Sequence, residues 1–250
     1  MSDSLEIKEK IVSGLMWIQT ARIYEYGIRF FSGIYLARTI APDFFGQQAY
    51  AIGLFTIMSL IVMFGQDLFI IRQYLPQKDT EVKLLLGSQI SIRMGLTLLL
   101  FTILVLLWTT NIVPIKQDMK IFVFALLIGQ APNQIIAIYS HYMEKLLQFK
   151  KLALINVISS SIAVFTGVYL AFQGQTIWAL LAIVILKNIC VAILTLLISP
   201  ILVKPIINMK SMKEFFHFGK ILFISDSAGR ISLIIDQLSI GSIISTTTLG

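Results

Sequence analysis

The stretch IWALLAIVILKNICVAILTLLI, residues 177–198, decides the fold class of this chain. It carries one charged residue, Lys187, in twenty-two positions. A helix needs about 20 apolar residues to cross a bilayer, so the stretch is long enough. Inside lipid the backbone must satisfy its own hydrogen bonds, which favours a helix over an isolated strand. The stretch therefore predicts a transmembrane helix.

Six further segments extend this pattern along the chain. Three contain at most one charged residue, one is broken late by Asp67, and two contain several charges. They are, in that order, residues 84–108, 121–142 and 152–172, then 45–71, then 12–37 and 215–240. Of the 250 residues, 57% are hydrophobic and 13% are charged, whereas a soluble domain carries roughly 25% charged residues. We predict an all-α fold, a polytopic transmembrane helical bundle with seven spans.

The seven spans predict two unequal parts. Residues 1–205 would form an N-terminal lobe of six helices, and residues 206–250 would begin a second lobe with the seventh helix. A faint repeat supports a parallel duplication, because Gly14 lies 32 residues before Gly46 and Gly219 lies 31 before Gly250. Since the second lobe stops after one helix, we expect the chain to be truncated.

The formal net charge of +7 could point to nucleic acid. Its distribution favours a membrane topology instead. With a cytoplasmic amino terminus, twelve basic residues fall on the cytoplasmic side, three on the opposite side and five within spans. Short cytoplasmic loops carry such an excess of lysine and arginine. We therefore predict a multi-pass protein of the inner cell membrane, with a cytoplasmic amino terminus and no nucleic-acid partner.

Charged residues inside the first span are candidate site residues, because one at mid-bilayer costs about 2.5–3.5 kcal/mol. Arg22, Glu25 and Arg29 are spaced three and four apart, so they share one helical face. They would line a substrate cavity, or they would form a self-neutralising ladder between helices. The ladder leaves one arginine without a partner.

Four deep charges in other spans likewise have a functional and a structural interpretation. Asp226 and Arg230, four residues apart in the seventh span, could pair or line the cavity. Arg93 and Lys187 are lone charges in the third and sixth spans, and Arg93 is close enough to the basic end to snorkel. Basic groups exceed acidic ones by three among the deep charges. This surplus favours an anionic cargo, such as a phosphate-bearing head group.

Pro132 lies in mid-span beside Gln130, Asn133 and Gln134. A proline inside a helix removes a hydrogen bond and kinks the helix. Membranes tolerate this where the freed carbonyl is buried in protein or faces water. The kink would either pack on a neighbouring helix or contact the substrate.

The sequence lacks the motifs of several enzyme classes. It has no GxxxxGK[ST] phosphate loop, no HExxH and no GxSxG. It also has no pair of glycines at GxxxG spacing. His141 and Glu144 have a metal-like spacing, but they end a helix at the water boundary, so we expect no metal site and no cofactor. The single cysteine, Cys190, cannot form an intrachain disulfide. We expect that the protein is not an enzyme.

Four stretches resemble the Wzx-type polysaccharide and O-antigen flippases, the oligosaccharide flippase family of the multidrug/oligosaccharidyl-lipid/polysaccharide exporter superfamily. They are SGLMW (13–17) running to LARTIAPDFFG (36–46), MFGQDLFIIRQ (63–73), QFKKLALINVISS (148–160) with QGQTIWALLA (173–182), and FGKILFISDSAGRISLIIDQLSIGSII (218–244). One departure is Lys220, which stands where a proline often follows the FG of the family.

The resemblance implies two six-helix lobes around a cavity lined mainly by helices one, two, seven and eight. It implies a flippase that moves an undecaprenyl-diphosphate-linked oligosaccharide, an O-antigen or capsule repeat unit, from the cytoplasmic to the outer leaflet by alternating access. The implied partners are this lipid-linked oligosaccharide, the membrane, and a glycan polymerase with its chain-length machinery. The alternatives are a cation-coupled multidrug exporter, a membrane glycosyltransferase or polymerase, and a non-functional fragment.

Overall fold

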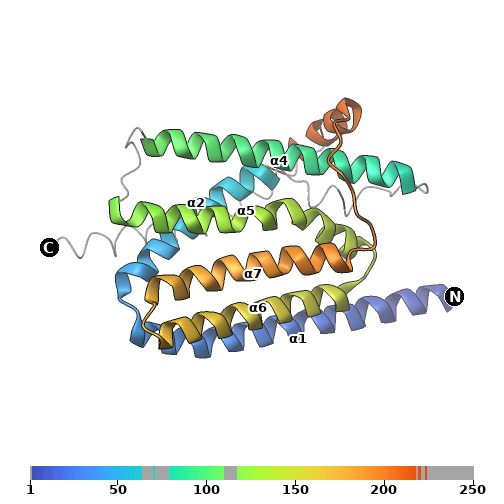
Figure 1. The fold of residues 1–250 in the computed structure, drawn as a ribbon. Coiled ribbons are helices and arrows are strands. Elements are labelled where there is room, and N and C mark those ends of the chain that lie inside the picture. The colour runs from blue at the N-terminus through green and yellow to red at the C-terminus, as the bar shows by residue number, and fades with distance from the viewer. Residues whose placement is uncertain are drawn as a thin grey trace. The chain divides into compact units, whose positions relative to one another are not determined.

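A computed structural model describes residues 2–63, 79–109 and 117–217, together with Ile70, Gly219, Lys220 and Phe223. Within these residues all regular structure is helical, as predicted, and residues 209–217 are helical as well. The six bounded helices, seen in Figure 1, are α1 (Ser2–Thr39), α2 (Pro42–Met63), α4 (Asp79–Thr109), α5 (Gln117–Lys145), α6 (Phe149–Phe172) and α7 (Thr176–Ile198).

Five of these helices are long and apolar enough to cross a membrane, namely Pro42–Met63, Thr80–Leu106, Phe122–Lys145, Phe149–Phe172 and Thr176–Ile198. They correspond to the second to sixth predicted spans. The first predicted span is helical within α1, but α1 is not one of the five because Arg22, Glu25 and Arg29 interrupt it. Most of the seventh predicted span, 215–240, lies outside the described residues, as does Asp67.

The chain changes direction where its residues favour a helix end. α1 ends at Thr39 and α2 begins at Pro42. Proline suits the first helical position because the N–H that it lacks would have no partner there. Between α6 and α7, Gly174 adopts φ +80°, a conformation that glycine accepts readily. The next amide, Gln175 N–H, donates to the Leu170 carbonyl at 2.9 Å and so closes α6.

The described residues group into two compact units. The first consists of residues 1–41 and 139–200, and so contains α1, the end of α5, α6 and α7. The second consists of residues 42–138 and 201–250, and contains α2, α4 and most of α5. The predicted boundary between lobes near residue 205 stays a prediction.

In the first unit, α6 lies between α1 and α7 (Figure 1). Its contact with α7 depends on small side chains at every fourth position of α6. The buried members of this small-residue stripe are Ser159, Ala163, Gly167 and Ala171. A Cβ added at Gly167 would overlap the side chain of Ile183 and lie 3.0 Å from the Ala179 carbonyl oxygen. The helices therefore approach through small-xxx-small spacing, which a search for paired glycines alone does not find.

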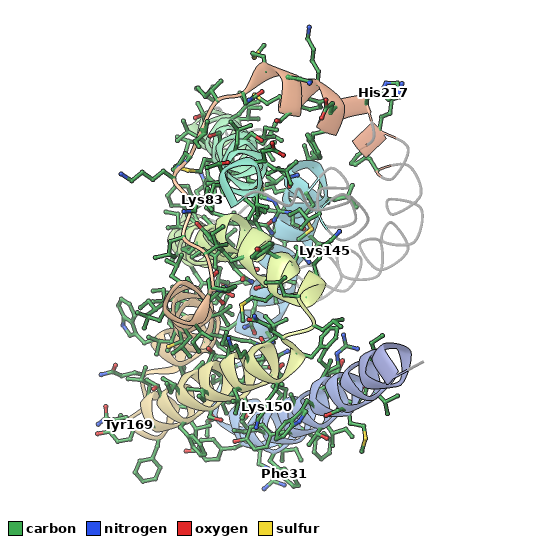
Figure 2. The ribbon with its side chains drawn as sticks, turned by 90° about the vertical axis from the view of Figure 1, so that its right-hand side faces the viewer. Phe31, Lys83, Lys145, Lys150, Tyr169 and His217 are labelled. Atoms are coloured by element: carbon green, nitrogen blue, oxygen red, sulfur yellow. The ribbon has the colours of Figure 1, made fainter. Side chains whose placement is uncertain are left out.

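The contact between α1 and α6 joins two stretches that were quoted above for the family resemblance. A Cβ at Gly14 would overlap the ring of Phe149. The Lys150 ammonium lies 5.1 Å from the ring centroid of Trp17, as a cation–π contact does. Further along, the Tyr24 and Ser161 hydroxyls are 2.9 Å apart. The two helices therefore run in the same direction. Phe31, 74% exposed, projects outward (Figure 2).

The second unit is held by aromatic and backbone contacts. The rings of Phe44 on α2 and Phe122 on α5 meet edge to face at 6.2 Å. The segment that follows α7 runs along α4, where Ile206 N–H donates to the Gly87 carbonyl at 3.1 Å. Phe215 is fully buried against Leu85 and its neighbours on α4. Residues 201–217 are therefore part of this unit rather than a free linker.

Candidate functional site

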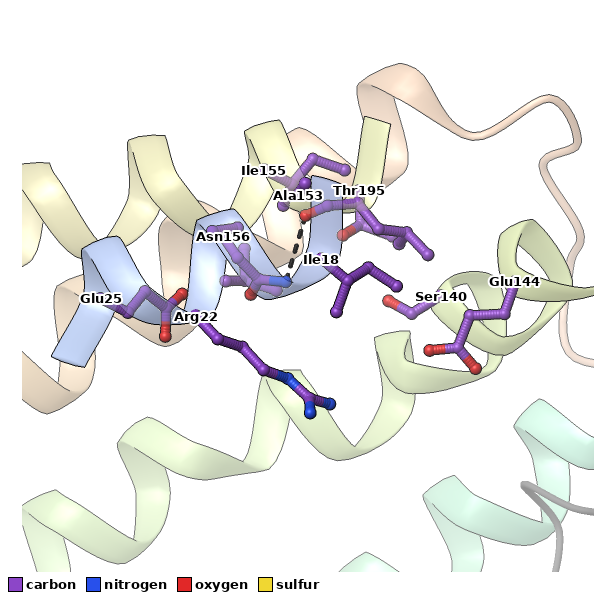
Figure 3. Close-up of a pocket in the computed structure, with 12 residues that line it drawn as sticks. Ile18, Arg22, Glu25, Ser140, Glu144, Ala153, Ile155, Asn156 and Thr195 are labelled. Atoms are coloured by element: carbon purple, nitrogen blue, oxygen red, sulfur yellow. Dashed lines mark hydrogen bonds between the residues drawn. The ribbon is translucent and has the colours of Figure 1, made fainter. Parts of the chain in front are cut away.

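A cavity of about 230 Å³ lies within the first unit. Four elements contribute to its wall: α1, the last turns of α5, the first turns of α6 and the last turns of α7. The lining residues are Ile18, Ala21, Arg22, Glu25, Ser140, Glu144, Leu152, Ala153, Ile155, Asn156, Val191 and Thr195 (Figure 3).

The cavity lies at the end of the first unit where the turn between α5 and α6 is found. α5 ends at Lys145 and α6 starts at Phe149, so the end of one helix and the start of the next lie together. The tight turn between them has Leu147 at φ 55° and is closed by Gln148 N–H donating to the Met143 carbonyl at 2.9 Å. The charge distribution predicts that this end is cytoplasmic.

Three charged side chains line the cavity: Arg22, Glu25 and Glu144. Arg22 is exposed and has no ion-pair partner among the residues that the structure describes. Glu144 lies 3.1 Å from His141 Nδ1. In Figure 3 the side chains of Arg22 and Glu144 extend toward each other from α1 and α5. Arg22 is thus available to an anionic ligand at the cavity.

Glu25 is the partner of two basic residues. Lys187 Nζ on α7 lies 3.1 Å from Glu25 Oε2, and both side chains are about four-fifths buried. Arg29 Nη2 lies 4.0 Å from the same oxygen, with its side chain 50% exposed. The sequence indicated that Lys187 is a lone charge, but in the structure it is paired with Glu25. The ladder interpretation holds for Arg29 and Lys187, whereas Arg22 remains outside it.

Arg93 belongs to the second unit and is fully buried on α4. Its Nη1 donates to the Gln134 carbonyl on α5 at 2.9 Å. Arg93 therefore does not snorkel toward the basic end, as the sequence would have allowed, because the guanidinium is held across α4 and α5. Gln134 lies two residues beyond Pro132 inside α5, so this bond favours the packing interpretation of the kink.

Polar residues that sequence reasoning missed also line the cavity. Thr195 is fully buried, and its Oγ1 has no hydrogen-bond partner in the part of the chain that the structure describes. Asn156 Nδ2 donates to the Leu152 carbonyl at 3.1 Å (Figure 3), and Ser140 is half-buried. The signal was present, since each is an uncharged polar residue near the same end of its span.

Of the seven predicted site residues, the structure brings Arg22 and Glu25 to the cavity. Arg29 and Lys187 contact Glu25 instead, and Arg93 lies in the other unit. Asp226 and Arg230 lie outside the described residues.

The charge of this cavity differs from the predicted basic surplus. Its charged lining is one arginine and two glutamates, and one of the glutamates, Glu25, is paired with Lys187 and Arg29, which are not part of the lining. Glu144 and His141 do not form part of a metal-ligand cluster, since no group of three or more histidine, cysteine or acidic side chains occurs among the described residues.

Long apolar helices, packed through small residues and enclosing a polar cavity at one end, define a polytopic helical membrane protein. The chain belongs to the polysaccharide biosynthesis protein family, whose family model matches residues 35–250. The matched residues include those of α5, α6 and α7 that line the cavity. The lining residues of α1 lie before residue 35 and so outside the match. No curated protein and no solved structure matches the chain.

Proposed function

We propose that this protein is a flippase that moves an undecaprenyl-diphosphate-linked oligosaccharide from the cytoplasmic to the outer leaflet of the inner membrane. Membership of a polysaccharide biosynthesis family supports a role in handling glycans. A multi-pass helical fold is compatible with moving such a substrate across the membrane. No covalent chemistry is needed, so the proposed protein is not an enzyme, and a glycan polymerase with its chain-length machinery would receive the product.

The observation that carries this proposal is Arg22. Its guanidinium lines the cavity and has no ion-pair partner among the described residues. A charged group inside a membrane protein marks a ligand pathway when it is not neutralised by its surroundings. Arginine presents a planar fork of donors that matches phosphate oxygens. Lys150 and Lys151 begin α6 at the same end, where they would attract an anionic head group.

The test is glycan export in cells that lack their own flippase and produce this protein. Arg22→Ala is expected to lower surface glycan about tenfold, because a hydrogen bond to a charged group contributes about 1.5–3 kcal/mol. Arg38→Ala, at an exposed site in the last turn of α1, is the matched control. Protein abundance in the membrane is measured alongside. Normal glycan export by Arg22→Ala would contradict the proposal.

A second candidate has one observation in its favour. One carboxylate of the cavity, Glu144, lies against His141 and has no lysine or arginine partner among the described residues. Such a lining suits a cationic cargo, as expected of a cation-coupled multidrug exporter. Producing the protein in a drug-sensitive cell distinguishes the two functions. Resistance to cationic dyes that is lost in Glu144→Gln would favour the exporter, and unchanged sensitivity would favour the flippase.

A further inference from the structure

We infer that the cavity holds one sugar ring of the lipid-linked glycan, bound through the uncharged polar groups of its inner wall, with Arg22 left to contact the phosphates. This inference rests on the proposed function and assigns the parts of the substrate to different residues. It makes Thr195 and Asn156 determinants of glycan binding, a role separate from that of Arg22.

The strongest evidence is Thr195. Its side chain lines the cavity, is fully buried, and leaves Oγ1 without a partner among the described residues. Buried hydroxyl groups in native proteins are almost always hydrogen-bonded, because an unsatisfied one loses free energy relative to water. A ligand hydroxyl in the cavity would supply the missing bond.

The remaining polar lining favours hydroxyl groups over phosphate. Asn156 uses Nδ2 on the Leu152 carbonyl, so its Oδ1 is left to accept a hydrogen bond. Ser140 can both donate and accept. Glu144 is an acceptor when ionised, and it would repel a phosphate that lay against it, whereas the charge of Glu25 is compensated by Lys187 and Arg29. A sugar hydroxyl, which donates and accepts, complements such a mixed wall.

Apolar groups complete the site. Ile18, Ile155 and Val191 also line the cavity, so they can pack against the C–H faces of a ring. The volume of about 230 Å³ is below the roughly 300–1,000 Å³ of sites for drug-sized ligands. The cavity therefore suits a single ring, and the rest of the glycan would lie outside it.

Binding of two probes to the purified full chain in lipid nanodiscs tests the inference. One probe is undecaprenyl diphosphate, which has no sugar. The other is the undecaprenyl-diphosphate-linked oligosaccharide extracted from the cells that make the protein. Thr195→Val keeps the side-chain shape and removes the hydroxyl, so it is expected to weaken binding of the glycan probe about fivefold to tenfold and to leave the sugar-free probe unchanged.

Three variants control the result. Arg22→Gln is expected to weaken the binding of both probes, because both carry the phosphates. Thr195→Ser keeps the hydroxyl and is expected to restore glycan binding. Thr166→Val removes a hydroxyl of α6 that donates to the Ile162 carbonyl and does not line the cavity, so it is expected to change neither affinity.

The possible failures are distinguishable. If the wild-type chain binds neither probe, the proposed function fails and the sugar site fails with it. If the wild-type chain binds both, and Thr195→Val weakens both alike or neither, the sugar site alone is overturned.

Discussion

Glu25 shows how one acidic residue decides the roles of the basic residues around it. Its carboxylate lies 3.1 Å from Lys187 Nζ and 4.0 Å from Arg29 Nη2. A charge buried in a membrane protein is costly unless it is paired or hydrated. Lys187 on α7 is therefore stabilised by a residue of α1. Arg22, three residues before Glu25, has no such partner among the described residues, which leaves it to the cavity.

This arrangement predicts energetic coupling between Glu25 and Lys187. Glu25→Gln and Lys187→Met should each destabilise the protein, because the first leaves Lys187 without its carboxylate and the second leaves Glu25 with the longer Arg29 contact alone. The double variant should lose less than the sum, with a coupling energy of about 0.5–3 kcal/mol. Unfolding in mixed micelles at increasing dodecyl sulfate measures it. The same cycle with Arg29→Gln in place of Lys187→Met is the control. Its coupling energy should be smaller, since exposed pairs contribute roughly 0–1 kcal/mol. Additive losses for Glu25 and Lys187 would contradict the pairing.

Helix packing in the first unit depends on where side chains are small. Gly14 allows α1 to approach the ring of Phe149 on α6, and Gly167 allows α6 to approach Ile183 and the Ala179 backbone on α7. Apolar surface gives little driving force between helices in lipid, so close packing of this kind contributes much of the association. The same contacts hold the α1, α6 and α7 walls of the cavity together.

Gly14→Ala is expected to destabilise the first unit by about 1–3 kcal/mol, the usual cost of overpacking. The added methyl group would overlap the Phe149 ring. Gly27→Ala is the control on the same helix, because a Cβ there meets nothing within 4 Å. Combining Gly14→Ala with Phe149→Leu should recover part of the loss. Equal stability of the two alanine variants in thermal unfolding in detergent would argue against the contact.

Gly167→Val should have a larger effect, since it would push α6 from α7 at a point where the backbone of Ala179 cannot yield. The expected loss is at least about 3 kcal/mol, beyond the usual overpacking range of 1–3 kcal/mol because the obstacle is partly backbone. Gly33→Val on α1 is the comparison, since its Cβ meets nothing within 4 Å. Comparable melting temperatures for the two variants would show that the small-residue stripe does not mediate the contact.

At the scale of the whole molecule, the direction of the helices agrees with the charge distribution. α1 and α6 run in the same direction, since Gly14 contacts Phe149 and Tyr24 contacts Ser161. Among the described residues, three further long helices, α2, α4 and α5, lie between them in the chain. If each of these crosses the membrane, α6 must cross in the same sense as α1. The start of α6 then lies on the same side as the amino terminus.

Reporter fusions test this topology. A fusion after Gln175, in the turn between α6 and α7, is expected to report the outer side. A fusion after Leu146, in the turn between α5 and α6, is expected to report the cytoplasm. The physical reason is the excess of twelve basic residues over three on the side of the amino terminus. A cytoplasmic signal from the Gln175 fusion would show that the predicted orientation is inverted.

The sequence by itself determined the fold class and most helix positions. Segments such as 177–198 are apolar over the thickness of a bilayer, and this is a local property that requires no knowledge of neighbours. The small-residue stripe of α6 could also have been predicted, because its spacing is a local property of the sequence. The pattern to look for was small residues at every fourth position, not pairs of glycines. The family resemblance agreed with the match over residues 35–250 to a polysaccharide biosynthesis family.

The tertiary structure alone decided which charges are paired and which are available. Glu25 and Lys187 are 162 residues apart in the chain, and Arg93 finds the Gln134 carbonyl 41 residues away. Spacing along one helix shows which side chains share a face, but not what the facing helix presents. For that reason Arg22 and Arg29 were equivalent in the sequence and differ in the structure. Thr195 and Asn156 became cavity residues for the same reason, because packing of α1, α5, α6 and α7 places them around one space.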